Sequence, residues 1–250
     1  MQALLHVLII IPAYNESENI VWVVENLRRV CPQFDYVVVN DGSSDRTAEI
    51  CRQHGYHLLS LPVNLGLAGA FQTGMRYAYM YDYDAAIQFD ADGQHQAEYI
   101  EPMAEKLSRG YDIVIGSRFL VGKKPHTARM AGSRLLTWTI RVTTGCRITD
   151  PTSGMRIYSR RMIREFATQI NHPPEPDTVS YLIKRGAKVA EIQVKMNKRR
   201  SGESYLSFSR SIGYMARMGI SILLVQPFRG SARPLKPPER AGKKESAVCR

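Results

Sequence analysis

The sequence predicts an α/β fold in which a mainly parallel sheet is flanked by helices on both faces. The first observation is that short apolar, β-branched segments recur along the 250-residue chain, and the second is that helix-length segments separate the early ones. The third is the composition, because 44% hydrophobic and 23% charged residues are ordinary for a globular domain with a full core. Strand alternating with helix is typical of a parallel sheet, since each parallel connection has to cross back along the sheet.

The expected elements follow from these segments in chain order. Most apolar segments are bounded by Asn, Asp, Gly or Pro, and the expected strands are Val7–Ile11, Tyr36–Val39, His57–Leu61, Ala85–Phe89, Asp112–Ile115 and Val189–Val194. The expected helices are Glu16–Val30, Asp45–His54, Leu67–Met80, Ala97–Ser108, Ala128–Thr143, Arg160–Thr168 and Thr178–Arg185. Ligands of such sheets bind beyond the carboxyl ends of the strands, so the residues after each strand are the candidates for a site.

The C-terminal part of the chain differs in composition from the rest. Residues Ser207–Val225 are apolar apart from Arg210 and Arg217, which predicts an amphipathic helix that docks on a membrane, on a partner or on the domain's own core. Residues 226–250 are rich in Pro, Lys and Arg, carry a net charge of +5, and are expected to be disordered. The expected division is therefore a domain over residues 1–206, a docking helix over 207–225 and a basic tail over 226–250.

The net charge of +11 indicates an anionic partner, such as a nucleotide, a lipid phosphate or a membrane surface. Nucleic-acid binding is a remote alternative, because no nucleic-acid-binding motif occurs and much of the excess charge lies in the tail. The four cysteines lack CxxC spacing, which argues against a disulfide framework or a zinc site. No apolar run is long enough to predict a transmembrane helix, and the first residues lack the features of a signal peptide, so a cytoplasmic chain is expected.

Two aspartates follow the expected strand Ala85–Phe89. In an extended strand end Asp90 and Asp92 would face the same side, and two neighbouring carboxylates repel each other unless a cation lies between them. Such oxygen ligands select Mg²⁺ or Mn²⁺ over Zn²⁺, and Gln94 would add a neutral oxygen. A solvated turn is the alternative for an isolated pair, but the buried strand before it favours the metal site.

A second polar cluster follows the expected strand Tyr36–Val39. Asp41 would accept a hydrogen bond from the ring N–H of uracil or guanine, and Gly42 would let the backbone approach a ligand closely. Asp45 would cap the next helix. A capped turn without any ligand explains the same residues equally well.

Basic residues follow the later expected strands. Arg118 comes directly after one strand, and Arg129 and Ser133 would share a helix face four residues apart. Arg199 lies in a basic turn that leads to Ser204. Guanidinium groups suit phosphate oxygens because their planar fork binds two oxygens at once, although a solvated basic face is the ordinary alternative.

Four motifs occur in order along the chain: Ile11–Glu16, Val39–Asp45, Phe89–His95 and Asp150–Arg156, the last preceded by Gly116–Arg118. Together they resemble an inverting glycosyltransferase of family 2, over roughly residues 6–206. The resemblance implies the Rossmann-like GT-A fold and is strongest to polyprenyl- or dolichyl-phosphate sugar transferases. It implies transfer from a nucleotide-sugar to a polyprenyl phosphate at the inner face of the cytoplasmic membrane, in cell-envelope glycan biosynthesis. Asp41 suits either uracil or guanine, and of the two donors we expect a UDP-sugar rather than a GDP-sugar.

The resemblance also implies a role for each candidate residue. The residues that would bind the nucleotide-sugar are Pro12, Tyr14, Glu16, Asp41, Asp90, Arg199 and Ser204. Those that would bind the divalent cation, Mg²⁺ or Mn²⁺, are Asp90, Asp92 and Gln94, and those for the acceptor phosphate are Arg118, Arg129 and Ser133. The implied catalytic set is Asp92, Arg118, Arg129 and Arg199. The subgroup commonly has a Lys after the serine, whereas this chain has Tyr205, which leaves one phosphate contact open.

The acceptor has an alternative. A lipid phosphate is already an anion and needs no general base, whereas a saccharide hydroxyl needs one. Glu175 or Asp177 lies where other family-2 enzymes have an acidic base, although Asp177 is also placed to cap the helix Thr178–Arg185. We expect polyprenyl phosphate. Further expected partners are an anionic membrane surface, a small membrane protein and a second copy of the chain, while the sugar is not identified by the sequence.

Overall fold

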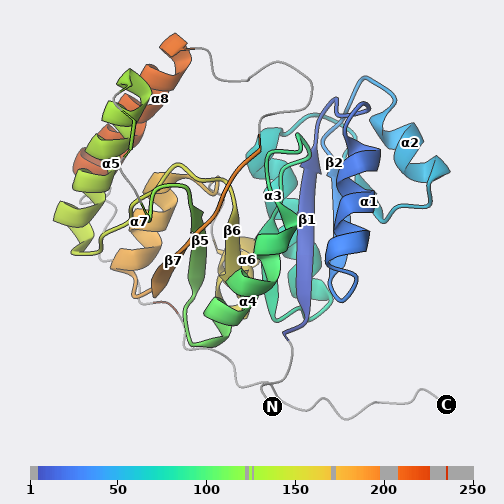
Figure 1. Ribbon diagram of the computed structural model, residues 1–250, viewed down its shortest axis with the longest axis horizontal. Helices are drawn as coiled ribbons and strands as arrows, with labels where there is room; N and C mark the ends of the chain where they lie inside the picture. Colours follow the sequence, from blue (N-terminus) through green and yellow to red (C-terminus); the bar gives the residue numbers. More distant parts are fainter. Residues whose placement is uncertain are drawn as a thin grey trace.

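Seven strands form one sheet in the computed structural model, which describes residues 5–121, 124–125, 127–169, 173–197, 208–225 and 235 (Figure 1). The strands are β1 (Val7–Ala13), β2 (Asp35–Asn40), β3 (Leu58–Ser60), β4 (Ala85–Gln88), β5 (Ile113–Ser117), β6 (Arg156–Ser159) and β7 (Val189–Gln193). Their spatial order is β3-β2-β1-β4-β6-β5-β7. All neighbouring pairs are parallel except those of β6, which runs antiparallel to β4 and β5. The predicted mainly parallel α/β sheet is confirmed.

The strand β6 was not predicted from the sequence. Its first residue is Arg156, and the segment is short and follows the polar fourth motif, so it lacks the apolar run that marks the other strands. In the structure Ile157 pairs with Ile87 of β4 and Val114 of β5, and Arg156 itself is buried. The insertion of β6 between β4 and β5 places the fourth motif beside the third.

Helices cover both faces of the sheet. They are α1 (Ile20–Val30), α2 (Thr47–Gln53), α3 (Gly66–Met80), α4 (Ile100–Ser108), α5 (Ala128–Thr144), α6 (Arg160–Thr168), α7 (Pro176–Lys184) and α8 (Phe208–Ile220). A 3₁₀ turn at Ala97–Tyr99 precedes α4, and a short π-helical segment at Ser221–Val225 follows α8. The helix expected from Glu16 begins only at Ile20, because the residues before it form turns at the end of β1.

The alternation of side chains along β1 divides the core into two clusters. Leu8 and Ile10 belong to the cluster that also contains residues of α3, α5, α6, α7 and α8, whereas Val7, Ile9 and Ile11 belong to the one that contains residues of α1 and α4. The α3 helix lies very close to β1, because a Cβ at Gly74 would come within 2.3 Å of an Ile10 methyl carbon. The absence of a side chain at Gly74 therefore allows this tight packing of α3 on β1.

The helices α5 and α8 pack side by side at the outer end of the sheet, beyond β7 (Figure 1). A Cβ at Gly132 of α5 would meet the Met215 sulfur of α8 at 2.2 Å. Met215, Met218 and Ile222 are buried in the same cluster as the inner residues of α5. Among the described helices, none is both long and apolar enough to span a bilayer. The basic tail lies outside the described residues apart from Leu235, which is buried.

Candidate active site

The loops that follow β1 and β2 are bonded to each other. The Asn15 side-chain oxygen accepts hydrogen bonds from the backbone N–H groups of Ser44 (2.9 Å) and Asp45 (3.4 Å). The Asn15 N–H donates to the Ser43 hydroxyl at 3.0 Å. Asn15 has a left-handed backbone with φ +55°, which asparagine tolerates better than most residues. The first and second motifs thus form one cradle at the carboxyl edge of the sheet.

Asp45 also connects the loop after β1 to the loop after β2 through hydrogen bonds. One of its carboxylate oxygens accepts from the Ser17 N–H at 3.0 Å, and the other accepts from the Thr47 N–H at 2.9 Å. Burial by itself would raise the pKa of Asp45, but hydrogen bonds from Thr47 and Ser17 outweigh it and hold the pKa below its usual range. Arg46 occupies the N-cap position of α2, so the expectation that Asp45 is the cap is wrong, although Asp45 bonds the first helical residue, Thr47.

Asp41 is buried at the end of β2. One carboxylate oxygen accepts from the Leu65 N–H at 2.7 Å, so it also holds the loop that leads into α3. Gly42, with φ +63°, was expected to allow the close approach of a ligand. A Cβ there would instead lie 2.6 Å from the backbone nitrogen of Asn64, so the close neighbour is this loop. Within the described part of the chain, no hydrogen bond is found for the other carboxylate oxygen of Asp41.

The remaining nucleotide-site candidates of the first motif lie beside Asp41. Pro12 is the register partner of Val39 in β2, and Tyr14 is half-buried in the loop directly after β1. The Glu16 side chain accepts from the Asn19 amide at 2.7 Å, immediately before α1. The structure therefore brings Pro12, Tyr14 and Asp41 to one edge, and gives Glu16 a bond at the start of a helix.

Asp90 and Asp92 lie in a turn, and the prediction that they extend the strand is wrong. β4 ends at Gln88, and Gly93 has φ +76°, which reverses the chain. The Asp92 carboxylate accepts from the Gln94 N–H at 3.0 Å, which closes this turn on itself. Asp92 is buried, whereas the Asp90 side chain is 33% exposed.

His95 holds Asp90 in place and was not predicted. Its ring Nδ1 accepts from the Asp90 N–H at 3.0 Å, so its other nitrogen carries the proton, and that nitrogen lies 3.5 Å from an Asp90 carboxylate oxygen. The Gln88 amide donates to the second oxygen of Asp90 at 2.9 Å. His95 closes the third motif, but only the folded turn brings its buried ring back onto Asp90.

The chemistry of this turn fits a hard divalent cation. Asp90, Asp92 and Gln94 offer oxygen ligands only, which suits Mg²⁺ or Mn²⁺ that takes its remaining ligands from a diphosphate and water. No group of three or more His, Cys, Asp or Glu side chains suited to a metal occurs within the described part of the chain. The described residues therefore do not form a metal site in which protein side chains supply every ligand.

Two other segments reach this turn. A Cβ at Gly154 of the fourth motif would lie 3.1 Å from an Asp90 carboxylate oxygen, so no larger residue fits there without movement. The Asn197 N–H donates to the Gln94 carbonyl at 2.9 Å, and the Gln96 amide donates to the Asn197 side chain at 2.7 Å. Asn197 is the last described residue before the basic turn, and Arg199 and Ser204 of that turn lie outside the described residues.

Arg118 forms a two-pronged ion pair with Asp150. Its guanidinium donates to the two carboxylate oxygens at 2.7 and 2.9 Å. Burial alone would raise the pKa of Asp150, but the hydrogen bonds and charge of Arg118 hold the pKa below its ordinary value. The Arg118 side chain remains 24% exposed, so it reaches the surface of the site while it anchors the Asp150 loop.

A second cation beside this pair was not predicted. The Lys124 ammonium donates to the Ser133 hydroxyl at 2.9 Å and to the Thr137 hydroxyl at 3.2 Å. Burial lowers the pKa of Lys124, while the charges of Asp150 and Glu191 raise it. Ser133, an acceptor-phosphate candidate, is thus bonded to a lysine, whereas nothing is described of the Arg129 side chain four residues earlier.

The acidic base candidates lie at the start of α7. Glu175 occupies the N-cap position and Asp177 lies in the first turn, so the expectation that Asp177 caps this helix is wrong. Burial and then the charge of Asp177 raise the pKa of Glu175, against the opposing charges of Arg217 and Arg156. Asp177 accepts from the Ser221 hydroxyl at 2.9 Å, so it bonds the segment after α8.

Arg156 connects these two parts of the site. It is buried, and its two terminal nitrogens donate to the carbonyl oxygen of Pro151 at 2.7 Å and to that of Pro174. The loop of the fourth motif is therefore bonded to the segment that leads to Glu175.

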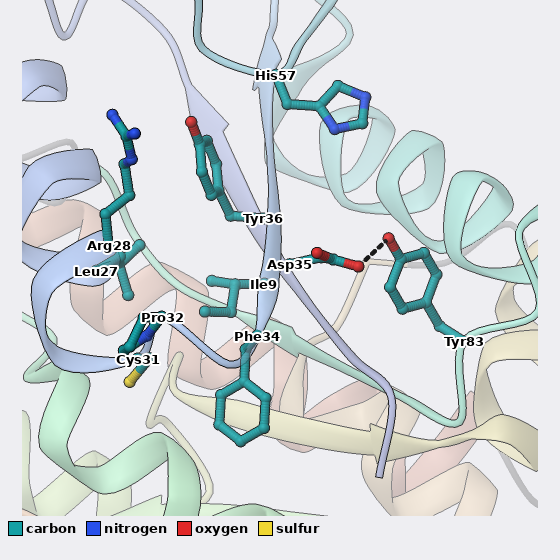
Figure 2. Close-up of a pocket in the computed structure, with 10 residues that line it drawn as sticks. All are labelled: Ile9, Leu27, Arg28, Cys31, Pro32, Phe34, Asp35, Tyr36, His57 and Tyr83. Carbon is teal, nitrogen blue, oxygen red and sulfur yellow. Dashed lines mark hydrogen bonds between the residues drawn. The ribbon is translucent and has the colours of Figure 1, made fainter. Parts of the chain in front are cut away.

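A cavity of about 620 Å³ lies at the opposite end of the sheet, near the start of β2 (Figure 2). Its polar side chains bond to neighbours: the Tyr83 hydroxyl donates to Asp35 at 2.9 Å, and His57 bonds the Tyr77 hydroxyl at 3.1 Å. None of the predicted site residues lines it.

Comparisons with known proteins bear on the family and the fold. The model of the family described as glycosyl transferase family 2 matches residues 8–166. An undecaprenyl-phosphate mannosyltransferase of Micrococcus luteus is 31% identical over 219 residues, which are 81% of this chain and 88% of that protein. A polyprenol monophosphomannose synthase of Mycolicibacterium smegmatis is 28% identical and covers 81% of each chain. The structure of glucosyl-3-phosphoglycerate synthase from Mycobacterium tuberculosis with Mn²⁺, UDP and glucosyl-3-phosphoglycerate has a TM-score of 0.61, with 20% identity over 89% of this chain and 80% of that one.

Proposed function

The chain belongs to glycosyl transferase family 2, and from this we propose that it transfers a sugar from a nucleotide-sugar to a polyprenyl phosphate. The observation that carries the proposal is the meeting of the third and fourth motifs, where the Gly154 backbone lies against Asp90. This contact sets the donor cradle next to Arg118 and Lys124, the cations of the acceptor side. The two relatives named for undecaprenyl-phosphate and polyprenol phosphate transfer support this choice of acceptor.

The donor would lie across the cradle of the first three motifs. Pro12, Tyr14 and Asp41 would hold the nucleoside, and we propose uracil as its base, in line with the UDP bound by the M. tuberculosis enzyme. Asp90, Asp92 and Gln94 would hold Mg²⁺ or Mn²⁺ at the diphosphate. A divalent cation supplies positive charge that stabilises the departing nucleoside diphosphate.

The acceptor phosphate would lie beside Lys124. Within the described part of the chain no carboxylate lies within ion-pair distance of this half-buried ammonium, which therefore favours an anion next to it. Ser133 and Thr137 would add hydroxyl donors, and Arg118 and Arg129 would add charge. A cluster of this kind suits the oxygens of a phosphate monoester, which carries up to two negative charges.

The reaction needs alignment more than proton transfer. A lipid phosphate carries its negative charge near neutral pH, so it attacks the anomeric carbon without a general base. The attack comes in line with the departing diphosphate and inverts the anomeric centre. Arg199 and Ser204 would close over that diphosphate from the turn that begins at Asn197.

Transfer to a saccharide hydroxyl is the second candidate, because the pKa of Glu175 is raised and an elevated pKa suits a general base. Asp177 is less suited to this task, since it bonds Ser221. We propose that the enzyme works peripherally at the inner face of an anionic membrane, where its lipid acceptor lies. A small membrane protein or a second copy of the chain would be a further partner there.

The direct test is a donor and acceptor screen. UDP- and GDP-sugars are incubated with Mg²⁺, Mn²⁺ or a chelator, each with and without a short-chain polyprenyl phosphate. We expect nucleoside diphosphate release and lipid-linked sugar to appear together, and only with both metal and lipid phosphate. Release that depends on a saccharide instead, and that Glu175→Gln abolishes, would replace this proposal with the second candidate.

A further inference from the structure

The outer face of α5 is apolar although it lies on the surface. Leu135, Trp138 and Val142 are 53%, 56% and 60% exposed, and their spacing of three and four residues places them along one stripe. The opposite face of the helix carries Leu136 and Ile140, which are fully buried in the core. The outer stripe is therefore additional to the packing that holds α5 on the domain.

The charged residues of α5 and α8 themselves are all positive. Arg134 and Arg141 are exposed on α5 next to the stripe, and Arg217 is exposed on the neighbouring α8. Neither α5 nor residues 208–225 contain an aspartate or glutamate. Ile220, Leu223 and Leu224, at the end of α8 and just after it, add further exposed apolar side chains. An anionic apolar surface complements such a face.

We propose that the outer face of α5, formed by Leu135, Trp138 and Val142 with Arg134 and Arg141 beside them, is the surface that lies on an anionic lipid bilayer. Tryptophan favours the boundary between headgroups and acyl chains, and arginine pairs with anionic headgroups. The inference rests on the proposed function in one respect, since Ser133 and Thr137 of the same helix hold Lys124 at the proposed acceptor-phosphate site. The lipid chain of the acceptor then leaves the site toward the bilayer on which α5 lies.

The charges disfavour two other occupants. A second copy bound through the same face by two-fold symmetry would bring Arg134 and Arg141 against the same residues of its partner, and like charges repel. The segment 226–250 of this chain carries +5, so it is repelled by the same arginines. An anionic bilayer would both bury the apolar stripe and pair its headgroups with the arginines.

Trp138 provides a direct probe, because the chain has only two tryptophans. In the full-length Trp22→Phe protein, the emission of Trp138 is followed during titration with vesicles of phosphatidylcholine alone or mixed with phosphatidylglycerol. We expect a blue shift with the anionic vesicles, quenching by brominated acyl chains, and weaker binding at high salt. Unchanged emission under conditions in which the protein floats with the vesicles would overturn the proposal.

A matched pair of variants separates this face from general surface hydrophobicity. Leu135→Asp should weaken the affinity for anionic vesicles about tenfold, since a large apolar side chain no longer enters the bilayer. Met80→Asp, at a 74% exposed position on α3, should leave that affinity unchanged. Equal losses in both variants, or a lipid-free dimer in sedimentation that Leu135→Asp dissociates, would overturn the proposal.

The transfer assay distinguishes this proposal from the proposed function. With the acceptor embedded in vesicles Leu135→Asp should lose activity, and with a water-soluble short-chain polyprenyl phosphate it should keep the activity of the unmodified protein. If the unmodified protein transfers sugar to neither acceptor, the proposed function fails. The Trp138 emission would still show whether the outer face of α5 binds the bilayer.

Discussion

The proposed donor side and the proposed acceptor side of this molecule differ in how their polar side chains are bonded. On the proposed donor side, carboxylate or amide oxygens accept from backbone N–H groups: those of Asn15, Asp41 and Asp45 bond neighbouring loops, and that of Asp92 closes its own turn. On the proposed acceptor side, the hydrogen bonds of the half-buried Lys124 ammonium within the described part of the chain go to hydroxyls only, and the ammonium lies over the Phe119 ring. The loops of the proposed donor side are therefore bonded to one another without a ligand, whereas the proposed acceptor side carries a positive charge with which an anion could pair.

The largest expected effect is the loss of activity when Asp92, on the proposed donor side, is replaced. Asp92→Asn keeps an oxygen that accepts from the Gln94 N–H, so the turn should persist, but it removes a negative charge from the cation site. We expect kcat/KM for sugar transfer to fall by about 10³-fold or more. Glu49→Gln, on the exposed surface of α2, is the control and should retain activity. Full activity of Asp92→Asn in purified protein would remove this residue from the site.

The next largest effect is expected from replacing Lys124, which should weaken binding of the acceptor alone. Lys124→Met keeps the length of the side chain but removes the charge, so we expect the KM for polyprenyl phosphate to rise about 100-fold while the KM for the nucleotide-sugar stays the same. Lys106→Met, whose ammonium lies over the Tyr111 ring on another part of the surface, is the matched control. Steady-state kinetics with each substrate varied in turn make the measurement. A parallel change in both KM values would contradict the separation of the two sides.

A smaller effect, on the affinity for Mn²⁺, is expected from replacing His95. His95→Phe removes the ring nitrogen that accepts from the Asp90 N–H, so Asp90 is held less firmly. We expect the affinity for Mn²⁺ in the presence of UDP, measured by calorimetry or electron paramagnetic resonance, to fall about tenfold. His95→Asn should recover part of that affinity, because its side-chain oxygen also accepts a hydrogen bond. Unchanged Mn²⁺ affinity in His95→Phe would limit His95 to packing.

The smallest effect concerns Glu175, at the junction of α7 and α8. Its pKa is raised in the folded protein, so the folded state holds this proton more tightly than the unfolded state does. The contribution of Glu175 to stability is therefore full below its unfolded pKa and is lost as the pH rises through the folded value. Glu175→Gln should raise Tm slightly at neutral pH and leave it nearly unchanged at low pH, as thermal unfolding across pH would show. A lower Tm at neutral pH would contradict this sign.

Much of the donor side could be predicted because its signals are local. Asp41 and Asp90 each follow an apolar strand, and the carboxyl ends of neighbouring parallel strands meet at one edge of the sheet. The geometry of the third motif was predicted wrongly, since β4 ends at Gln88 and a turn, rather than an extended strand, carries Asp92. A single glycine with a left-handed backbone is enough to change the direction of such a short segment.

The acceptor side could be predicted only in part. Arg118 and Ser133 were found from their residue types, but the pairing of Arg118 with Asp150 depends on β6, which the sequence did not reveal. Lys124 lies in a polar loop that resembles any solvated basic turn. Its burial against α5 is a consequence of tertiary packing alone.

The sequence by itself determined the alternation of strands and helices, the family motifs and the oxygen-rich donor set, because each depends on residues a few positions apart. Only the tertiary structure decided that β6 enters the sheet antiparallel, that His95 turns back onto Asp90, and that Lys124 meets Ser133 and Thr137. It also decided which apolar residues of α5 face the core and which remain outside. The β6 pairing joins segments far apart in the chain, whereas His95 and Lys124 meet partners five to thirteen residues away. In each case the burial and the hydrogen bonds come from the folded arrangement, which no local pattern specifies.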